Sequence, residues 1–165
     1  MPAEFDPIEE SRKQWLAHGW ADEADGMSLV TSVMRVHQLL LARVDRTLKP
    51  FALTFSRYEV LALLSFTRRG SLPMNKITKR LQVHATSTTN SVDRLEAAGL
   101  AARRPHPADG RTTLVEITEA GRDLVARATA ALNAEVFLSP GLDGTSLRRL
   151  LGDLGALRTG LESLD

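Results

Sequence analysis

The chain has 165 residues, 43% of them hydrophobic and 25% charged, and a net charge of +1 at pH 7, as expected for a globular protein with a buried core. It contains no cysteine, which excludes disulfides, thiolate metal sites and sensing by cysteine oxidation. Without an apolar run of about 18 residues or a secretory leader, the sequence predicts a cytoplasmic protein with no membrane span.

The first predicted helix begins in an acidic stretch. Asp6 offers a side-chain acceptor at the N-cap, Pro7 takes the first helical position, and acidic residues follow near the positive end of the helix dipole. Gly19 is expected to end this helix. Residues 1–27 hold seven acids and two bases, a net charge of −5. We expect this acidic arm to pack on the body of the protein or on a second subunit, the alternative being a loosely held tail.

Two further helices are predicted before residue 70. Residues 27–49 repeat apolar side chains every three or four positions, on a face too broad for a simple surface stripe, which indicates burial on more than one side. The next helix is expected to start at Thr54 or Ser56, with Ser56 and Glu59 matching a capping box. Gly70 is expected to close it.

A short strand near Leu72 and two short helices then form the segment on which the fold depends. The helices are expected near Met74–Leu81 and Ala85–Ala98, and their tight polar joint indicates a helix-turn-helix. His84 is placed to cap the second helix and Gly99 to end it.

A β-hairpin is predicted directly after these helices. Leu100–Arg104 and Thr112–Thr118 are rich in strand-forming residues, whereas Pro105–Gly110 is expected to be a loop. A hairpin that follows a helix-turn-helix is a wing.

The second short helix has a polar outer face. At about 100° per residue, Thr88, Val92 and Leu95 face inward. The outward residues are Thr86, Asn90 and Asp93, with Thr89 and Arg94 at the edges. Asn can bond adenine bidentately and Thr can contact phosphate or a thymine methyl. Helices this rich in hydroxyls are poor helix formers without such a partner, so the face suits a major groove.

The charge of this region agrees with a nucleic-acid partner. Residues 76–111 contain seven Lys or Arg and three acids, a net charge of +4 in a chain of +1. Concentrated basicity is typical of a surface that binds phosphates. A solvated charged face would look similar by charge alone, and the helix-turn-helix topology favours the DNA interpretation.

Two more helices are predicted after the wing. Thr118 is the expected N-cap of the first, which runs to about Leu138 and is followed by a Ser-Pro-Gly break. The second starts after Asp143 and carries a stripe of leucines too apolar for an isolated surface helix. Another subunit is the expected partner of that stripe.

Short motifs recur in a fixed order from Leu53 to Val125. They are Leu53-Thr54, Tyr58-Glu59-Val60-Leu61, Leu81-x-Val83, Val92-Asp93-Arg94-Leu95-Glu96, Gly99-Leu100, Arg103-Arg104, Pro107-x-Asp109-x-Arg111 and Leu114-Val115-x-Ile117-Thr118-x-x-Gly121. In this order and spacing the stretch resembles the core of the MarR family of winged helix-turn-helix transcription regulators. The resemblance covers nearly half of the chain.

This resemblance implies a mainly α fold with a small β-wing (α+β). The winged helix-turn-helix DNA-binding domain would span residues 51–118, and residues 1–50 and 119–165 would form an α-helical dimerisation region. The residues at the family's DNA-contacting positions are Thr86, Ser87, Thr89 and Asn90 in the major groove and Arg111 in the minor groove. Asp109 resembles the wing acid that holds the neighbouring arginine, and Arg94 lies at the edge of the same outer face.

A dimer would read a palindromic operator of double-stranded DNA, with half-sites about 34–36 Å apart. The resemblance further implies a repressor released by a small, aromatic ligand in the crevice between the two regions. The candidate ligand residues are Trp15, Trp20, Met34, His37, Arg43, Phe51, Phe55 and Tyr58, and the alternative for each is simple core packing. No cofactor or metal is expected.

Two other function classes are alternatives to DNA binding. An enzyme is not expected, because the sequence has no nucleophile elbow, phosphate-binding glycine loop or His-Glu-x-x-His, and its four histidines are scattered. The alternative is a winged-helix protein-interaction module without specific DNA binding. Arg111→Ala would separate the two, because only a DNA contact predicts weaker binding with a smaller salt dependence.

Overall fold

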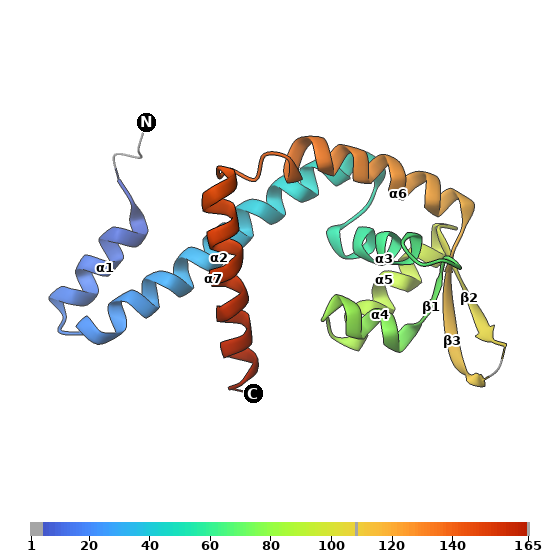
Figure 1. The fold of residues 1–165 in the computed structure, drawn as a ribbon, viewed down its shortest axis with the longest axis horizontal. Coiled ribbons are helices and arrows are strands. Elements are labelled where there is room, and N and C mark those ends of the chain that lie inside the picture. Colours follow the sequence, from blue (N-terminus) through green and yellow to red (C-terminus); the bar gives the residue numbers. More distant parts are fainter. Residues whose placement is uncertain (1–4, 108, 165) are drawn as a thin grey trace.

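The chain folds into a winged part and a set of long helices that extend away from it (Figure 1). The computed structural model describes residues 5–107 and 109–164, with the backbone alone for residues 109–111. In chain order the elements are α1 (Pro7–Ala17), α2 (Ala21–Leu48), η1 (Lys49–Phe51), α3 (Phe55–Ser65), β1 (Ser71–Pro73), α4 (Met74–Leu81), α5 (Ala85–Ala97), β2 (Ala101–His106), β3 (Asp109–Ile117), α6 (Glu119–Leu132), the π-helical η2 (Asn133–Phe137) and α7 (Gly144–Glu162). The predicted α+β class is confirmed.

The winged part has its core between three helices and one face of a small sheet. The strand order is β1-β3-β2, with both neighbours antiparallel. Helices α3, α4 and α5 pack together and against the sheet, and their apolar sides are fully buried around Leu61, Leu64, Ile77 and Leu95, with Val115 from β3. This core places α5 with one face inside and the other in solvent.

The wing hairpin is longer than predicted. The expectation of a loop over Pro105–Gly110 is wrong, because β2 continues to His106 and β3 begins at Asp109. Strand β2 lies at the edge of the sheet, where a proline can be accommodated because its missing N–H can face solvent. The pairing shifts register between Pro105 and His106. A bulge of this kind accommodates extra residues in one strand without ending the strand.

Three details at helix ends also differ from the sequence prediction. The N-cap of α3 is Thr54, whose Oγ1 accepts a hydrogen bond from the N–H of Arg57 at 3.4 Å, so the predicted Ser56–Glu59 capping box is wrong. His84 is the N-cap of α5, but its side chain makes no capping hydrogen bond. Helix α2 begins at Ala21 rather than near residue 27, because the segment before Gly26 is rich in Ala and in acids that favour a first turn.

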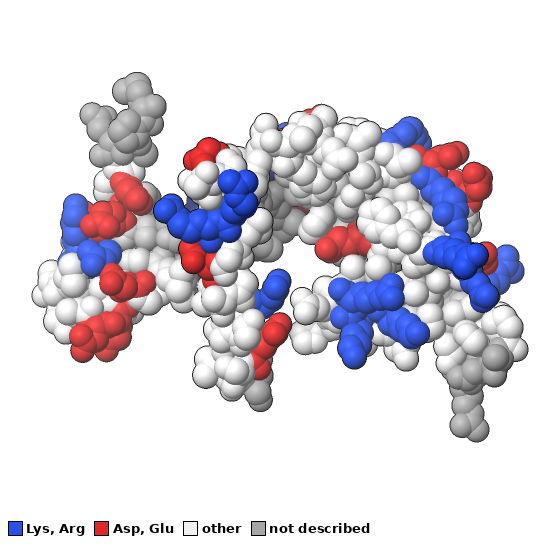
Figure 2. All heavy atoms as spheres, in the orientation of Figure 1, with Lys and Arg blue, Asp and Glu red and all other residues white. Residues whose placement is uncertain are grey.

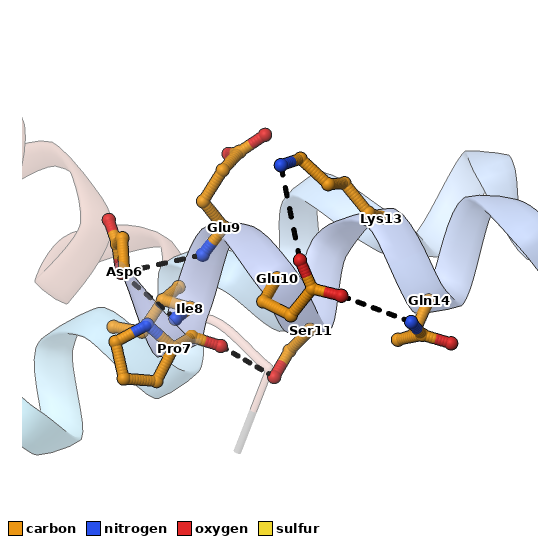
Figure 3. Close-up of polar contacts among 8 residues, drawn as sticks. All are labelled: Asp6, Pro7, Ile8, Glu9, Glu10, Ser11, Lys13 and Gln14. Atoms are coloured by element: carbon orange, nitrogen blue, oxygen red, sulfur yellow. Dashed lines mark hydrogen bonds and ion pairs between the residues drawn. The ribbon is translucent and has the colours of Figure 1, made fainter. Parts of the chain in front are cut away.

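Helix α1 is held by local polar contacts at its start (Figure 3). Asp6 accepts a hydrogen bond from the N–H of Ile8 at 2.9 Å, as the N-cap prediction required. Gln14 donates to Glu10 at 3.1 Å, one turn along the helix. No residue of α1 is buried in the single chain. Its contacts are with α2, and Arg12 joins them through an ion pair to Asp25 at 2.8 Å.

The junction between α2 and the end of α6 is tied by hydrogen bonds across the two segments. The Arg43 guanidinium donates to the carbonyl oxygen of Ser139 at 2.8 Å and to that of Glu135. Thr47 donates to the Glu135 carboxylate at 3.0 Å. The C-terminal half of α2 is thereby fixed to η2, while its N-terminal half extends away from the winged part toward α1 (Figure 1).

Helix α7 has almost no partner within the described part of the chain. No other element packs against it over more than isolated contacts, and none of its residues is buried. Large apolar side chains are exposed along α7 and α2: Leu29, Val30, Val33, Met34, Val36, Leu39, Leu40, Leu41, Leu150, Leu151, Leu154 and Leu161. Among the described helices, none has the length and hydropathy needed to cross a membrane.

The start of α6 is pressed against the turn that follows α5, and Gly121 marks the contact. A Cβ added at Gly121 would lie 2.1 Å from the carbonyl oxygen of Leu100 and 2.9 Å from a side-chain carbon of Ile117. Gly121→Ala is therefore expected to lower the free energy of unfolding by about 1–3 kcal/mol, the usual cost of overpacking. Urea unfolding followed by circular dichroism measures this change.

The matched control is Gly26→Ala inside α2, where a Cβ meets no atom within 4 Å. That substitution should leave stability unchanged or raise it by up to about 1 kcal/mol, because alanine is the better helix former. A Gly121→Ala variant as stable as the wild type would show that α6 can shift away from Leu100 at no cost.

Candidate nucleic-acid interface

The outer face of α5 is the candidate surface for reading DNA. Its inner face is anchored by Thr88, Ser91, Val92 and Leu95, which are all buried. The exposed residues of α5 include every predicted contact on this helix: Thr86, Ser87, Thr89, Asn90 and Arg94. The helical period therefore brings hydroxyl, amide and guanidinium groups to one solvent-facing strip, as the sequence predicted.

Two concave surfaces flank this strip. On one side, a hollow of about 390 Å³ lies between Thr89, the start of α4 and the strand residues Thr112 and Thr113. On the other side, a hollow of about 420 Å³ lies between Asn90, Arg94 and the start of α3, where Arg57 also lines it. A ridge between two hollows suits DNA binding, because the ridge can enter the major groove while the two DNA backbones beside the groove lie in the hollows.

Arg103 of β2 connects the wing to α5. Its guanidinium forms ion pairs with Asp93 at 2.6 Å and with Glu96 at 2.5 Å, and its backbone N–H donates to Glu96 at 3.0 Å. The backbone and side-chain hydrogen bonds from Arg103 hold the pKa of Glu96 below its ordinary value. The sequence prediction counted Arg103 as a basic residue and as part of the Arg103-Arg104 motif, and did not predict its link to α5. Asp93 and Glu96 lie three positions apart on one helix face, and a turn and a strand follow them. This arrangement was the sequence signal from which a link to a basic residue of the strand could have been predicted.

The wing tip carries the remaining predicted DNA residues. Asp109 and Arg111 lie at the start of β3, so their backbone belongs to the tip of the hairpin. Their side chains lie outside the described residues, and the predicted pairing of Asp109 with Arg111 stays a prediction.

Basic and acidic side chains occur at both ends of the molecule, and their balance differs between the two ends (Figure 2). Lys and Arg side chains cluster over the winged part, whereas several Asp and Glu side chains lie on α1. The acidic arm and the basic segment predicted from the sequence are thus at opposite ends. A field of this kind attracts a polyanion to the winged part.

The residues predicted to bind a ligand do not converge in the single chain. Phe55 and Tyr58 stack with ring centroids 6.1 Å apart, and Tyr58 is buried with its hydroxyl 3.1 Å from that of Thr129. Trp15 instead packs edge-on against Trp20 on the α1–α2 turn, with centroids 5.2 Å apart. His37 is exposed on α2, and Arg43 is engaged with the backbone of η2 and its C-terminal flank.

A different group of residues lines a hollow where α2 meets α3. This junction hollow has a volume of about 680 Å³, and its charged lining residues are Asp45, Arg46, Lys49 and Arg57. The sequence prediction missed it, because residues 45–57 were interpreted as a helix end and a helix start. The turn through Ala52, whose backbone is left-handed at φ 53°, folds the two segments back on each other and creates the hollow.

Comparisons with known proteins agree with this geometry. The family model described as the MarR family matches residues 53–112. The chain is 45% identical to Sco5413, a MarR family transcriptional regulator from Streptomyces coelicolor, with a TM-score of 0.75 over 86% of this chain and 98% of that one.

Two further proteins are similar over most of their length. The HTH-type transcriptional repressor IacR of Pseudomonas putida is 30% identical over 79% of this chain and 77% of its own. The structure of CouR from Rhodococcus jostii RHA1, bound to p-coumaroyl-CoA, is 25% identical with a TM-score of 0.68, over 78% of this chain and 90% of that one. The chain belongs to the MarR family of winged helix-turn-helix, DNA-binding transcription regulators, and is not an enzyme.

Proposed function

We propose that this regulator is a homodimeric repressor that binds a palindromic operator and leaves it when a small anionic, aromatic ligand binds. One observation carries the proposal: the apolar faces of α2 and α7 are exposed in the single chain, and α7 has almost no partner among its own described residues. Residues 1–50 and 119–165 would supply the dimer contacts, and residues 51–118 would bind DNA.

The exposed apolar surface supports a dimer for a simple reason. Soluble monomers rarely leave contiguous apolar patches of this kind uncovered. A two-fold axis through these helices would bury α7 and would set two copies of α5 side by side. Two related reading helices about one turn of DNA apart require an operator with matching two-fold symmetry.

A ligand at the junction hollow would act between the two parts. Arg46, Lys49 and Arg57 line the hollow against one acid, Asp45, which favours an anionic group. CouR, a relative of similar fold, is bound to p-coumaroyl-CoA, an aromatic thioester that carries phosphates. Arg57 also lines the hollow beside Asn90 and Arg94 of α5. A ligand held by Arg57 would therefore be one residue away from the reading face.

The test begins with selection of bound duplexes from a random library, followed by fluorescence anisotropy. The selected sequences should have two-fold symmetry, with a dissociation constant of about 10⁻⁸ to 10⁻¹¹ M.

Two substitutions test the DNA contacts. Asn90→Ala should weaken binding by about 1–3 kcal/mol and relax the preference at one base pair of each half-site. Arg111→Ala should weaken binding to all sites and lower the salt slope by about one unit per protomer. Titration with p-coumaroyl-CoA and with benzoate then tests release.

Asn133→Ala is the control for the asparagine, because Asn133 is exposed on η2 outside the winged part. It should bind as the wild type does. An asymmetric selected site, or equal binding to selected and unrelated DNA, would contradict the palindromic operator. Failure of both ligands to bind by calorimetry and to release DNA would count against the junction hollow.

A further inference from the structure

The wing sheet has an outer face, which is turned away from the core of the winged part. Residues paired directly across neighbouring strands share a face of the sheet. Val115 pairs with Leu72 and Arg103 and faces the core and α5. Successive side chains of a strand point to opposite faces. Leu114 therefore lies on the outer face, together with its cross-strand partners Pro73 and Arg104.

This outer face is hollowed and basic. A concave surface of about 590 Å³ is lined by Arg69, Lys76, Arg104 and His106, and Glu116 is the one acid among its described lining residues. Arg104 pairs with Glu116 at 3.6 Å, and the Arg104 side chain is 67% exposed. An ion pair as exposed as this contributes little to stability. The Arg104 guanidinium is therefore available to a stronger anionic partner.

The start of α4 adds to the positive potential of the same hollow. Pro73, which is its N-cap and provides no side-chain hydrogen bond, lines the hollow together with Lys76 of the first turn. That turn contains no acid. A lysine near the positive end of a helix dipole is unfavourable unless an anion compensates it. The side chains and the helix end thus favour the same kind of ligand.

The position of this face identifies the anion. The sheet lies at the end of the molecule away from α1 and α7 (Figure 1), so in the proposed dimer the two outer faces point away from the two-fold axis. DNA that runs across both reading helices continues past the wings at both ends. We propose that the outer-face cluster, Arg69, Lys76 and Arg104, binds the phosphate backbone of DNA that flanks the operator. This inference rests on the proposed function, and it extends the footprint beyond the bases that are read.

The test compares two duplexes that carry the same selected site. The core duplex ends at the edges of that site, and the extended duplex adds about 10 bp, one helical turn, of unrelated sequence on each side. For the wild type, the extended duplex should bind about tenfold more tightly at low salt and with a steeper salt slope, because more phosphates are neutralised. The triple variant Arg69→Gln/Lys76→Gln/Arg104→Gln should lose this gain and bind the core duplex as the wild type does.

Arg68→Gln is the matched control, because Arg68 is the exposed neighbour of Arg69 but does not line the hollow. It should keep the gain. The inference is overturned if the triple variant keeps the gain, if the wild type shows none, or if the variant loses affinity equally on both duplexes. Abolition of the gain by millimolar inorganic phosphate, at constant ionic strength and with core binding intact, would identify a free-anion site instead. If the wild type bound neither duplex specifically, the proposed function itself would fail.

Discussion

The double variant Leu151→Asp/Leu154→Asp is expected to be a monomer that no longer binds its operator specifically. In the single chain these side chains are 60% and 41% exposed on α7. Burying a leucine contributes about 1.5–3 kcal/mol, whereas burying an unpaired carboxylate costs several kcal/mol. In a dimer, the double variant would lose the favourable burial of the leucines and would add the cost of burying carboxylates, on both protomers. Light scattering should show half the wild-type mass, and DNA affinity should fall to the non-specific range, about 10⁻⁴ to 10⁻⁶ M.

Ala156→Asp adds the same charge on the other side of α7. At about 100° per residue, two positions from Leu154 reach nearly the opposite face of the helix. This control should remain a dimer and bind DNA as the wild type does. A double variant that keeps its dimeric mass would show that α7 lies outside the interface. A monomer that still bound the operator tightly would contradict reading by two copies of α5.

The second large effect is expected at Arg103. Arg103→Leu removes the ion pairs to Asp93 and Glu96 and the tie between wing and α5. It also leaves two carboxylates uncompensated on α5, where they would repel the phosphates of bound DNA. DNA affinity should fall about 10- to 100-fold, through a smaller association rate and a faster release. Surface plasmon resonance at fixed salt measures both rates.

Arg103→Lys tests whether geometry matters beyond charge. Lysine keeps the positive charge but cannot engage two carboxylates with a planar fork, so it should recover only part of the lost affinity. Arg127→Leu, at an exposed position on α6, removes an equal charge outside the winged part and should have little effect. Full recovery by lysine would reduce the role of Arg103 to charge alone.

The same link predicts a dependence on pH. Because hydrogen bonds from Arg103 lower the pKa of Glu96 in the folded chain from its ordinary value of 4.5, its stabilisation is present above that value. It is lost as the pH falls through the lower, folded pKa. Wing mobility measured by hydrogen exchange should therefore rise below about pH 4.5 in the wild type. Arg103→Leu should show high mobility already at neutral pH.

The polar strip of α5 shows how far periodicity alone reaches. Thr88, Val92 and Leu95 are buried and Thr86 and Asn90 are exposed, as a period of 3.6 residues requires. The caps at Asp6 and Thr118 were equally predictable, because an N-cap depends on a side chain and the backbone within three residues of it. Local signals of this kind need no knowledge of distant parts.

The wing and the hollows show where local signals fail. Two prolines and a glycine predicted a loop over Pro105–Gly110, but pairing with β3 extends the strand to His106. The junction hollow depends on the return of the chain at Ala52, and the Arg103 link depends on the seating of β2 beside α5. Contacts that depend on how separate elements pack leave no period in the sequence to detect.

The sequence by itself determined the family, the helix-turn-helix with its wing, the exposed polar face of α5 and the concentration of basic charge. Each of these follows from the order, period and composition of neighbouring residues. Only the tertiary structure decided that Arg103 holds the wing, that Trp15 and Tyr58 belong to separate clusters, and that Arg69, Lys76 and Arg104 share one hollow. The physical reason is that strand register and helix packing bring these residues together, and both are set by the whole core.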